Sequence, residues 1–217
     1  AADEKSVAEG LRLLFEAKKP VIIAGRGVIV SGAKLELAQF ADLLDAPVLT
    51  TPDGKTALDE ENSRWCGIVG AYGMLCANKI ASQADLVVYV GSQASDQTTN
   101  NWTTPAPGVP VIHIDIDPVQ AGRNYPGASK LVGDAKKVLQ QLCAGLTGQM
   151  HQEWMATAGE LLRETISAQE FDISSNEMPI DPKYLCKELS AALPDDAVLV
   201  SDTGYSAIWT STMVRMK

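Results

Sequence analysis

The chain has few aromatic residues and no long apolar run. Aromatic side chains make up 6% of its 217 residues while apolar residues together make up 46%, so the core must be largely aliphatic and rich in alanine. Such a core suits parallel α/β layers, in which strands are covered on both faces. No apolar run reaches the roughly 18 residues that would span a bilayer, and we expect no membrane association.

Positive charge is also scarce. The chain has 18 Lys and Arg against 27 Asp and Glu, which gives a formal net charge of -9. Nucleic acids and anionic membrane surfaces need clustered basic side chains, so this balance argues against both as partners. The stretch AADEKSVAEG at residues 1–10 is polar and acidic, unlike a signal peptide, and we expect a cytoplasmic protein.

Closely spaced metal ligands are missing too. The two histidines, His113 and His151, lie far apart, and no CxxC pair occurs among Cys66, Cys76, Cys143 and Cys186. A zinc site is therefore not expected, and we interpret the cysteines as buried thiols in a reducing compartment. His113 lies among apolar residues, which favours a buried, hydrogen-bonded imidazole over a catalytic one.

What the chain does contain is an alternation of strand and helix patterns. Short apolar runs that predict strands covered on both faces occur at 21–24, 47–51, 85–91, 110–117 and 131–134. Apolar residues at helical spacing predict helices over 7–15, 33–44, 74–83 and 134–146. This alternation implies βαβ units with right-handed crossovers and a parallel sheet.

Some local details can be predicted as well. Ser31 is a candidate N-cap for the helix over 33–44. Within that helix the residues expected to face inward are Leu35, Leu37, Ala38, Ala41 and Leu44. Asp134 is expected to cap the helix that follows it.

The pattern changes beyond residue 147. A helix is expected near 150–168, and Asp181 with Pro182 supplies an N-cap and an N1 proline for a helix that ends at Leu193. The apolar run 197-AVLVS-201 predicts one more strand.

These patterns suggest three parts. We assign residues 1–171 to a nucleotide-binding-like α/β domain, 172–180 to a linker, and 181–217 to the N-terminal part of a second α/β domain.

The strand ends carry residue types that suit a ligand. In parallel α/β sheets, ligands bind at the carboxyl ends of the strands. Glycine lets a backbone approach a phosphate, and an acidic side chain can accept hydrogen bonds from ribose. The ends here are Gly25-Arg26-Gly27, Thr50-Thr51-Pro52, Gly91-Ser92-Gln93, Asp115-Ile116-Asp117 and Gly133-Asp134.

The spacing alone leaves two interpretations open. Gly25 and Gly27 are followed by Gly32, so the dinucleotide fingerprint GxGxxG is not met. The glycines could hold a nucleotide or only close tight turns, and Asp115 and Asp117 could equally be turn and cap residues.

Five segments together resemble the central domain of thiamine-diphosphate-dependent enzymes, in the group of acetolactate synthase, oxalyl-CoA decarboxylase and benzoylformate decarboxylase. They are 20-PVIIAGRGV-28, 47-PVLTTPDGK-55, 85-DLVVYVGS-92, 112-IHIDIDP-118 and 132-VGDAKKVL-139. Residues 181–204 resemble the start of the domain that binds the cofactor diphosphate. The resemblance implies a three-layer α/β/α Rossmann-like fold with a parallel six-stranded sheet, followed by the first helix and strand of a second α/β domain.

The same resemblance implies a function. The chain would be a fragment of an enzyme that uses thiamine diphosphate and Mg²⁺ to decarboxylate or ligate 2-oxo acids. Such enzymes are homodimers or tetramers, and the partners of this chain would be the remaining domains. No catalytic residue and no metal ligand is expected here, because the activating Glu and the GDG…Asn motif belong to other domains; 133-GDA-135 only resembles that motif.

The resemblance also suggests site residues. Some family members hold FAD or ADP in the central domain and others hold nothing. The FAD or ADP contacts would fall on Gly25, Gly27, Thr51, Gly91, Asp115 and Asp134. Gly204, Tyr205 and Ser206 align with the turn that contacts the cofactor diphosphate.

The sequence departs from the family at two positions. Flavin-binding members usually have Arg where this chain has Gln93, which counts against FAD because Gln lacks the fixed fork of a guanidinium. Acetolactate synthases tend to have Gln-His where this chain has Tyr205-Ser206, which counts against that specific activity.

Two other hypotheses stay open. The chain could be a stand-alone or split-subunit nucleotide-binding module, or a structural domain that mediates assembly. The apolar residues Val198, Leu199 and Val200 would make an uncovered strand prone to associate.

Overall fold

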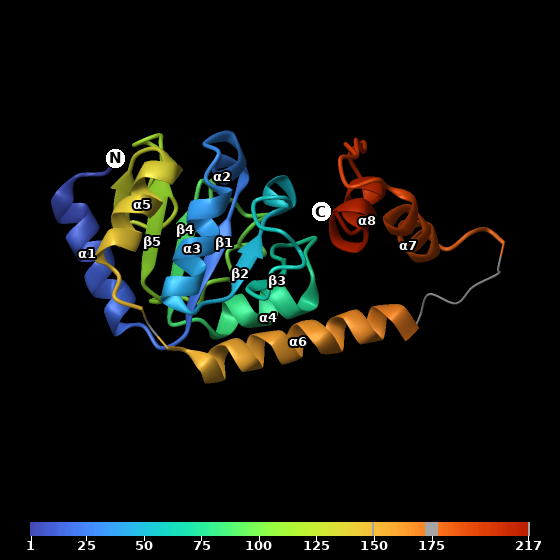
Figure 1. Cartoon of the computed structure of the whole chain (residues 1–217), viewed down its shortest axis with the longest axis horizontal. Coiled ribbons are helices and arrows are strands. Elements are labelled where there is room, and N and C mark those ends of the chain that lie inside the picture. The colour runs from blue at the N-terminus through green and yellow to red at the C-terminus, as the bar shows by residue number, and fades with distance from the viewer. Residues whose placement is uncertain (149, 172–177, 217) are drawn as a thin grey trace.

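The computed structural model describes residues 1–148, 150–171 and 178–216. Its centre is a six-stranded parallel sheet with the order β3-β2-β1-β4-β5-β6 (Figure 1). The strands are β1 (Pro20–Ala24), β2 (Val48–Thr50), β3 (Trp65–Ile68), β4 (Leu86–Val90), β5 (Val111–Asp115) and β6 (Ser129–Val132). The fold class expected from the resemblance is therefore confirmed.

Helices cover the sheet on both faces. They are α1 (Glu4–Glu16), α2 (Arg26–Val30), α3 (Lys34–Leu44), the 3₁₀ turn η1 (Pro52–Gly54), α4 (Leu75–Gln83), α5 (Ala135–Gly145), α6 (Gln152–Phe171), α7 (Pro182–Ala192) and α8 (Tyr205–Met213). Helix α5 packs against both α1 and α3, whereas α4 packs against α6. Helix α6 runs beneath the sheet in Figure 1, and α7 and α8 lie together beyond β3.

The apolar runs form the core as expected. Every residue of β1, β2, β3 and β4 is buried, and Ile22 and Ile23 are fully inaccessible to solvent. Strands that are apolar on both sides need cover on both faces, which the two helical layers supply.

Two of the expected helix caps are present. The Asp134 carboxylate accepts a hydrogen bond from the Lys137 backbone N–H at 3.1 Å. The Asp181 carboxylate accepts one from the Lys183 backbone N–H at 2.7 Å, with Pro182 as the first helical residue. Caps are readily predicted because they depend on residues three or fewer positions apart.

The details predicted around residue 33 are partly wrong. Ser31 does not cap α3: it ends the short helix α2, and its hydroxyl donates to the Gly27 carbonyl at 2.8 Å. Leu35 is 83% exposed, whereas Leu37, Ala41 and Leu44 are buried. Leu35 lies two residues before Leu37, about 200° away around the helix, so it faces solvent when Leu37 faces the sheet.

The strand predicted at 197–201 is also wrong. Those residues form no strand, and Val198 and Val200 are 86% and 87% exposed. A strand needs a hydrogen-bonded neighbour, and no part of the chain that the structure describes pairs with this segment. Residues 178–216 therefore contain the expected helix, α7, and then α8, but not the expected strand.

Strand β3 at Trp65–Ile68 has no counterpart among the strands that the sequence pattern predicts, although the resemblance implies six strands. Of the predicted linker, 172–177 lies outside the described residues.

Candidate functional site

A cleft of about 510 Å³ opens at the carboxyl ends of the strands. It lies where β1 and β4 are neighbours, the point at which the strand order reverses direction. All six residues predicted for FAD or ADP line it: Gly25, Gly27, Thr51, Gly91, Asp115 and Asp134. The volume falls within the range of roughly 300 to 1,000 Å³ that small-molecule sites occupy.

Three glycines form the floor of the cleft by close backbone contact. The Gly27 N–H donates to the Gly91 carbonyl at 2.9 Å, and the Gly25 N–H donates to the Val90 carbonyl at 2.9 Å. A Cβ on Gly25 would lie 2.4 Å from the Gly91 oxygen, and one on Gly27 would lie 2.6 Å from the Gly91 Cα. The glycines therefore do close a tight junction between strands, and that junction also leaves backbone atoms facing the cleft.

The acidic residues act as turn and cap residues. Asp115 Oδ1 accepts from the Asp117 N–H at 2.9 Å, and Asp117 Oδ1 accepts from the Val119 N–H at 2.8 Å. Of this pair, Asp115 lines the cleft and Asp117 does not. Thr51 has a similar role, because its hydroxyl oxygen accepts from the Gly54 N–H at 3.1 Å. The hydrogen bond from the Asp117 N–H uses only Oδ1 of Asp115. Its Oδ2 is therefore left to accept a hydrogen bond from a ligand.

The charge of the cleft limits how it could hold a phosphate. Among the described residues that line it, Arg26 is the only cation, against Asp53, Asp115 and Asp134. Gln93 is also on the wall. A phosphate here would depend on backbone N–H groups and Arg26, not on a cluster of basic side chains.

His113 holds the turn that follows β4. Its side chain is 1% exposed, its Nε2 lies 2.7 Å from the Ser92 carbonyl, and its Nδ1 accepts from the Gly122 N–H at 3.0 Å. These contacts match a neutral ring with its proton on Nε2. Burial lowers the pKa of His113 below its ordinary value. The expected buried, hydrogen-bonded imidazole is confirmed, and it supports the cleft through Ser92.

The predicted cofactor turn lies apart from the cleft. Gly204, Tyr205 and Ser206 are exposed at the start of α8, and none of them lines the cleft. Gly204 has φ +90 and offers no capping side chain. The first N–H groups of a helix have no partner within the helix, so this end of α8 is suited to an anion.

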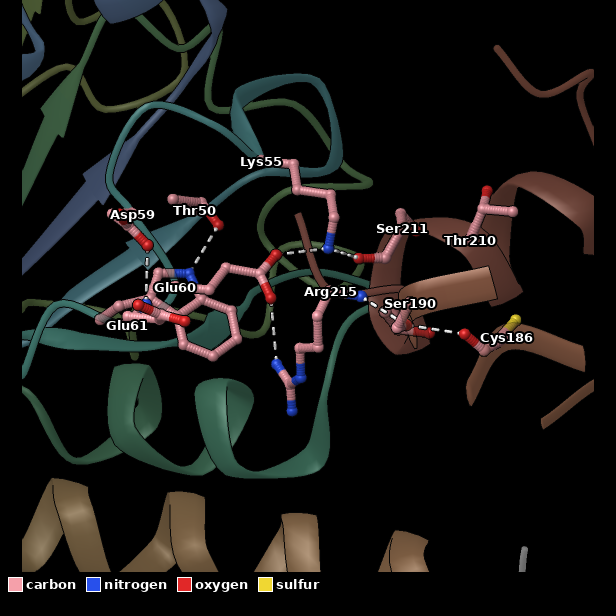
Figure 2. A network of polar contacts seen from close by, with 12 residues as sticks. Thr50, Lys55, Asp59, Glu60, Glu61, Cys186, Ser190, Thr210, Ser211 and Arg215 are labelled. Atoms are coloured by element: carbon pink, nitrogen blue, oxygen red, sulfur yellow. Dashed lines mark hydrogen bonds and ion pairs between the residues drawn. The ribbon is translucent and has the colours of Figure 1, made fainter. Parts of the chain in front are cut away.

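A charged cluster that the sequence did not reveal lies at the other end of α8. Glu60 pairs with Lys55 and with Arg215, which is 155 residues further along the chain (Figure 2). The signal for it was weak, since Lys55 and Glu60 sit in a polar loop and nothing in the sequence links them to Arg215.

The cysteines are not placed for chemistry. Cys66, Cys76 and Cys186 are buried and Cys143 is half-buried; all four are free thiols. Burial raises the pKa of Cys66 to about 12, so its reactive thiolate is suppressed at neutral pH.

Neither a metal cluster nor a membrane-spanning helix occurs among the described residues. No group of three or more His, Cys, Asp or Glu is placed to hold a metal ion there. Among the same residues, no helix is both long enough and apolar enough to cross a membrane.

The sheet and its cleft together define a class of protein. An open parallel sheet of order β3-β2-β1-β4-β5-β6, with a glycine-lined cleft at the reversal of strand order, is an α/β domain of the nucleotide-binding type. Within this class, the chain belongs to the thiamine pyrophosphate enzymes. Residues 7–142 match the central domain of that family.

Similar proteins are acetolactate synthases. The probable acetolactate synthase large subunit of Methanocaldococcus jannaschii is 32% identical over 97% of this chain and 36% of its own length. The acetolactate synthase large subunit of Haemophilus influenzae is 32% identical over 94% of this chain and 36% of its own. The acetolactate synthase of Mycobacterium bovis is 30% identical over 97% of this chain and 35% of its own. The chain thus spans about a third of the length of these relatives.

Proposed function

We propose that the chain is the central domain and the first elements of the diphosphate-binding domain of a thiamine-diphosphate-dependent enzyme that acts on 2-oxo acids. The reaction would be decarboxylation or carboligation, and Mg²⁺ would accompany the cofactor. The remaining domains of the same enzyme and further copies of it, as a homodimer or tetramer, would be the partners.

One observation carries this proposal. The match to the family's central domain ends at residue 142, but the similarity to the Methanocaldococcus jannaschii protein covers 97% of the chain. The segment with α7 and α8 is therefore included in the similarity. A stand-alone nucleotide-binding module would not need that segment, so the two-domain interpretation is favoured over the module.

The residues of this chain would bind and orient but carry out no bond making. Thiamine diphosphate, when bound, would supply the electron sink that loss of CO₂ from a 2-oxo acid requires. The N–H groups at the start of α8, next to Gly204, would hold one side of its diphosphate. The residues of the cleft would serve as a scaffold and, in addition, as a site for ADP or FAD. Gln93, which lacks the fixed fork of a guanidinium, counts against FAD.

The first experiment is to clone the whole gene. We expect an upstream pyrimidine-binding domain and a downstream GDG…Asn segment. An open reading frame that starts at residue 1 and stops after Lys217 refutes the proposal. The purified full-length protein, given pyruvate, thiamine diphosphate and Mg²⁺, should release CO₂. Acetaldehyde as the product indicates decarboxylation, and 2-acetolactate indicates carboligation.

A matched pair of variants tests the turn in that protein. Gly204→Ala places a Cβ on a residue at φ +90 and ψ -153, a conformation almost restricted to glycine. We expect it to raise the thiamine diphosphate concentration needed for half-maximal activity. Gly127→Ala is the control, because Gly127 has no positive φ and no atom within 4 Å of its added Cβ.

The cleft is tested separately by calorimetry with ADP and with FAD. Asp115→Asn keeps an oxygen for the Asp117 N–H but removes the charge, and we expect several-fold weaker ADP binding. Asp117→Asn should bind ADP normally, because Asp117 does not line the cleft. A flat titration with both ligands excludes the nucleotide site and leaves the enzymatic proposal standing.

A further inference from the structure

The C-terminal elements are joined to the central sheet by a nearly buried carboxylate. The Glu60 side chain is 5% exposed and forms two ion pairs. Lys55 Nζ lies 2.5 Å from its Oε1, and Arg215 Nη1 donates to its Oε2 at 3.1 Å. Figure 2 shows the carboxylate between the two cations, one from the loop after β2 and the other from beyond α8.

Each of the two cations also contacts elements other than Glu60. Lys55 Nζ also donates to the Ser211 carbonyl at 2.7 Å, in the last turn of α8. A positive charge at a helix C-terminus is favourable, because the last carbonyls carry partial negative charge. Lys55 therefore joins Glu60 directly to the end of α8.

Arg215 joins the same carboxylate to two other elements. Its guanidinium lies 5.3 Å from the ring centre of Trp65, the first residue of β3. Its backbone N–H donates to the Ser190 hydroxyl at 2.9 Å, and that hydroxyl donates to the Cys186 carbonyl of α7 at 2.7 Å. Next to it, Val214 is fully buried.

Burial makes the two ion pairs of Glu60 sensitive to the loss of any one partner. A charge that loses its water must be paired, so removal of one partner leaves the other uncompensated. Burial lowers the pKa of Lys55, and the pairing with Glu60 opposes that change. The charges of Lys55 and Glu60 are therefore compensated only while α8 and Arg215 are packed against the loop that carries these two residues.

We propose that Lys55, Glu60 and Arg215 are positioning residues for the turn at 204–206. They fix the C-terminal end of α8 against the β3 edge of the central domain. Because α8 is a rigid helix of nine residues, this also sets where its N-terminal N–H groups point. This inference rests on the proposed function, in which those groups hold the cofactor diphosphate.

The docking itself is tested in the 217-residue chain by amide hydrogen exchange. Glu60→Gln keeps the shape of the side chain but leaves two cations unneutralised. We expect at least about tenfold faster exchange in α8, because the two cations lose their common partner, with no change in β1 or β4. Glu16→Gln is the control, because Glu16 pairs with Arg12 on an exposed face of α1. Unchanged exchange in α8 overturns the inference.

The effect on the cofactor is tested in the full-length protein. Glu60→Gln should raise the half-saturating thiamine diphosphate concentration about tenfold, while kcat at saturating cofactor changes less than about twofold. A merely structural role would lower the amount of active enzyme and leave cofactor affinity unchanged. If Glu60→Gln does not fold, Arg215→Gln replaces the partner that is 38% exposed and tests the same link.

The two proposals fail in different ways. If Gly204→Ala weakens cofactor binding and neither Glu60→Gln nor Arg215→Gln does, the positioning role is overturned and the proposed function stands. If none of these variants weakens cofactor binding, the turn is not the diphosphate site and the positioning role is overturned with it. The enzymatic proposal is then decided by the CO₂ assay and by the reading frame of the gene.

Discussion

The central domain and the C-terminal segment of residues 178–216 are built in opposite ways. In the central domain the four strands β1 to β4 are buried along their whole length. Of the described residues in 178–216, only Cys186 and Val214 are buried, and α8 has no buried residue despite its apolar composition. The central domain therefore stabilises itself by burial, whereas the segment depends on a few polar contacts with the central domain.

The largest expected effect comes from truncating the core. Ile23→Ala in β1 should lower the free energy of unfolding by about 3 kcal/mol, since it leaves a cavity in a fully buried site. Val200→Ala, in the segment, should change it by less than about 0.5 kcal/mol because Val200 is 87% exposed. Urea denaturation of both variants measures the difference. Equal losses would contradict the contrast between the two regions.

The floor of the cleft should be the next most sensitive part. Gly25→Ala would force a Cβ to within 2.4 Å of the Gly91 oxygen, so β1 and β4 must separate. We expect a loss of about 2 kcal/mol, typical of overpacking, in the same urea experiment. Gly127→Ala, with open space around its added Cβ, should be close to neutral. A neutral Gly25→Ala would mean that the strand junction is looser than the structure shows.

The pH dependence should distinguish the two regions further. Burial lowers the pKa of His113, so below the ordinary value of 6.5 the unfolded chain binds more protons than the folded chain. The stability that neutral His113 contributes is full above that pH and is lost as the pH falls through the folded-state pKa.

His113→Gln removes this titration but keeps a donor and an acceptor. The difference in unfolding free energy between wild type and His113→Gln should therefore shrink between about pH 7.5 and about pH 5. Residues 178–216 contain no histidine, so the segment should contribute nothing to this change. Urea denaturation at several pH values provides the measurement, and a difference that stays constant with pH would contradict it.

The smallest effect on stability, with a clear effect on association, is expected at the exposed apolar residues of the segment. Val198→Asp and Val200→Asp should leave the free energy of unfolding within about 0.5 kcal/mol of wild type. They should reduce concentration-dependent association, measured by light scattering, because exposed apolar patches drive it. Val30→Asp is a matched control, since Val30 is 74% exposed on the central domain. Equal reduction by all three variants would show that the segment is not the associating surface.

The sheet could be predicted largely because its signals are local and strong. Strands β1 and β4 are uninterrupted apolar runs that end in glycine, and no other element explains such runs as well. Strand β3 was missed because 65-WCGI-68 is short and follows a polar loop. Leu35 cannot face inward together with Leu37, because residues two positions apart lie about 200° from each other around a helix.

The candidate site was predicted in its parts but not in its arrangement. Strand ends could be read as ligand residues because parallel strands bring their carboxyl ends to one edge. Whether Asp115 lines the cleft while Asp117 faces away depends on the turn after β5, which the sequence does not specify. The resemblance to a known family, not the spacing, supplied the list of six residues that the structure gathers.

The sequence by itself determined strands β1, β2, β4, β5 and β6 and the caps at Asp134 and Asp181, because these depend on apolar runs and on hydrogen bonds between near neighbours. The resemblance of five segments to known enzymes indicated the family. Only the tertiary structure decided that 197–201 is not a strand, since pairing needs a partner from elsewhere in the fold. It alone also joined Glu60 to Arg215 across 155 residues. An ion pair of this kind forms where folding brings distant charges together and removes their water, which no local pattern encodes.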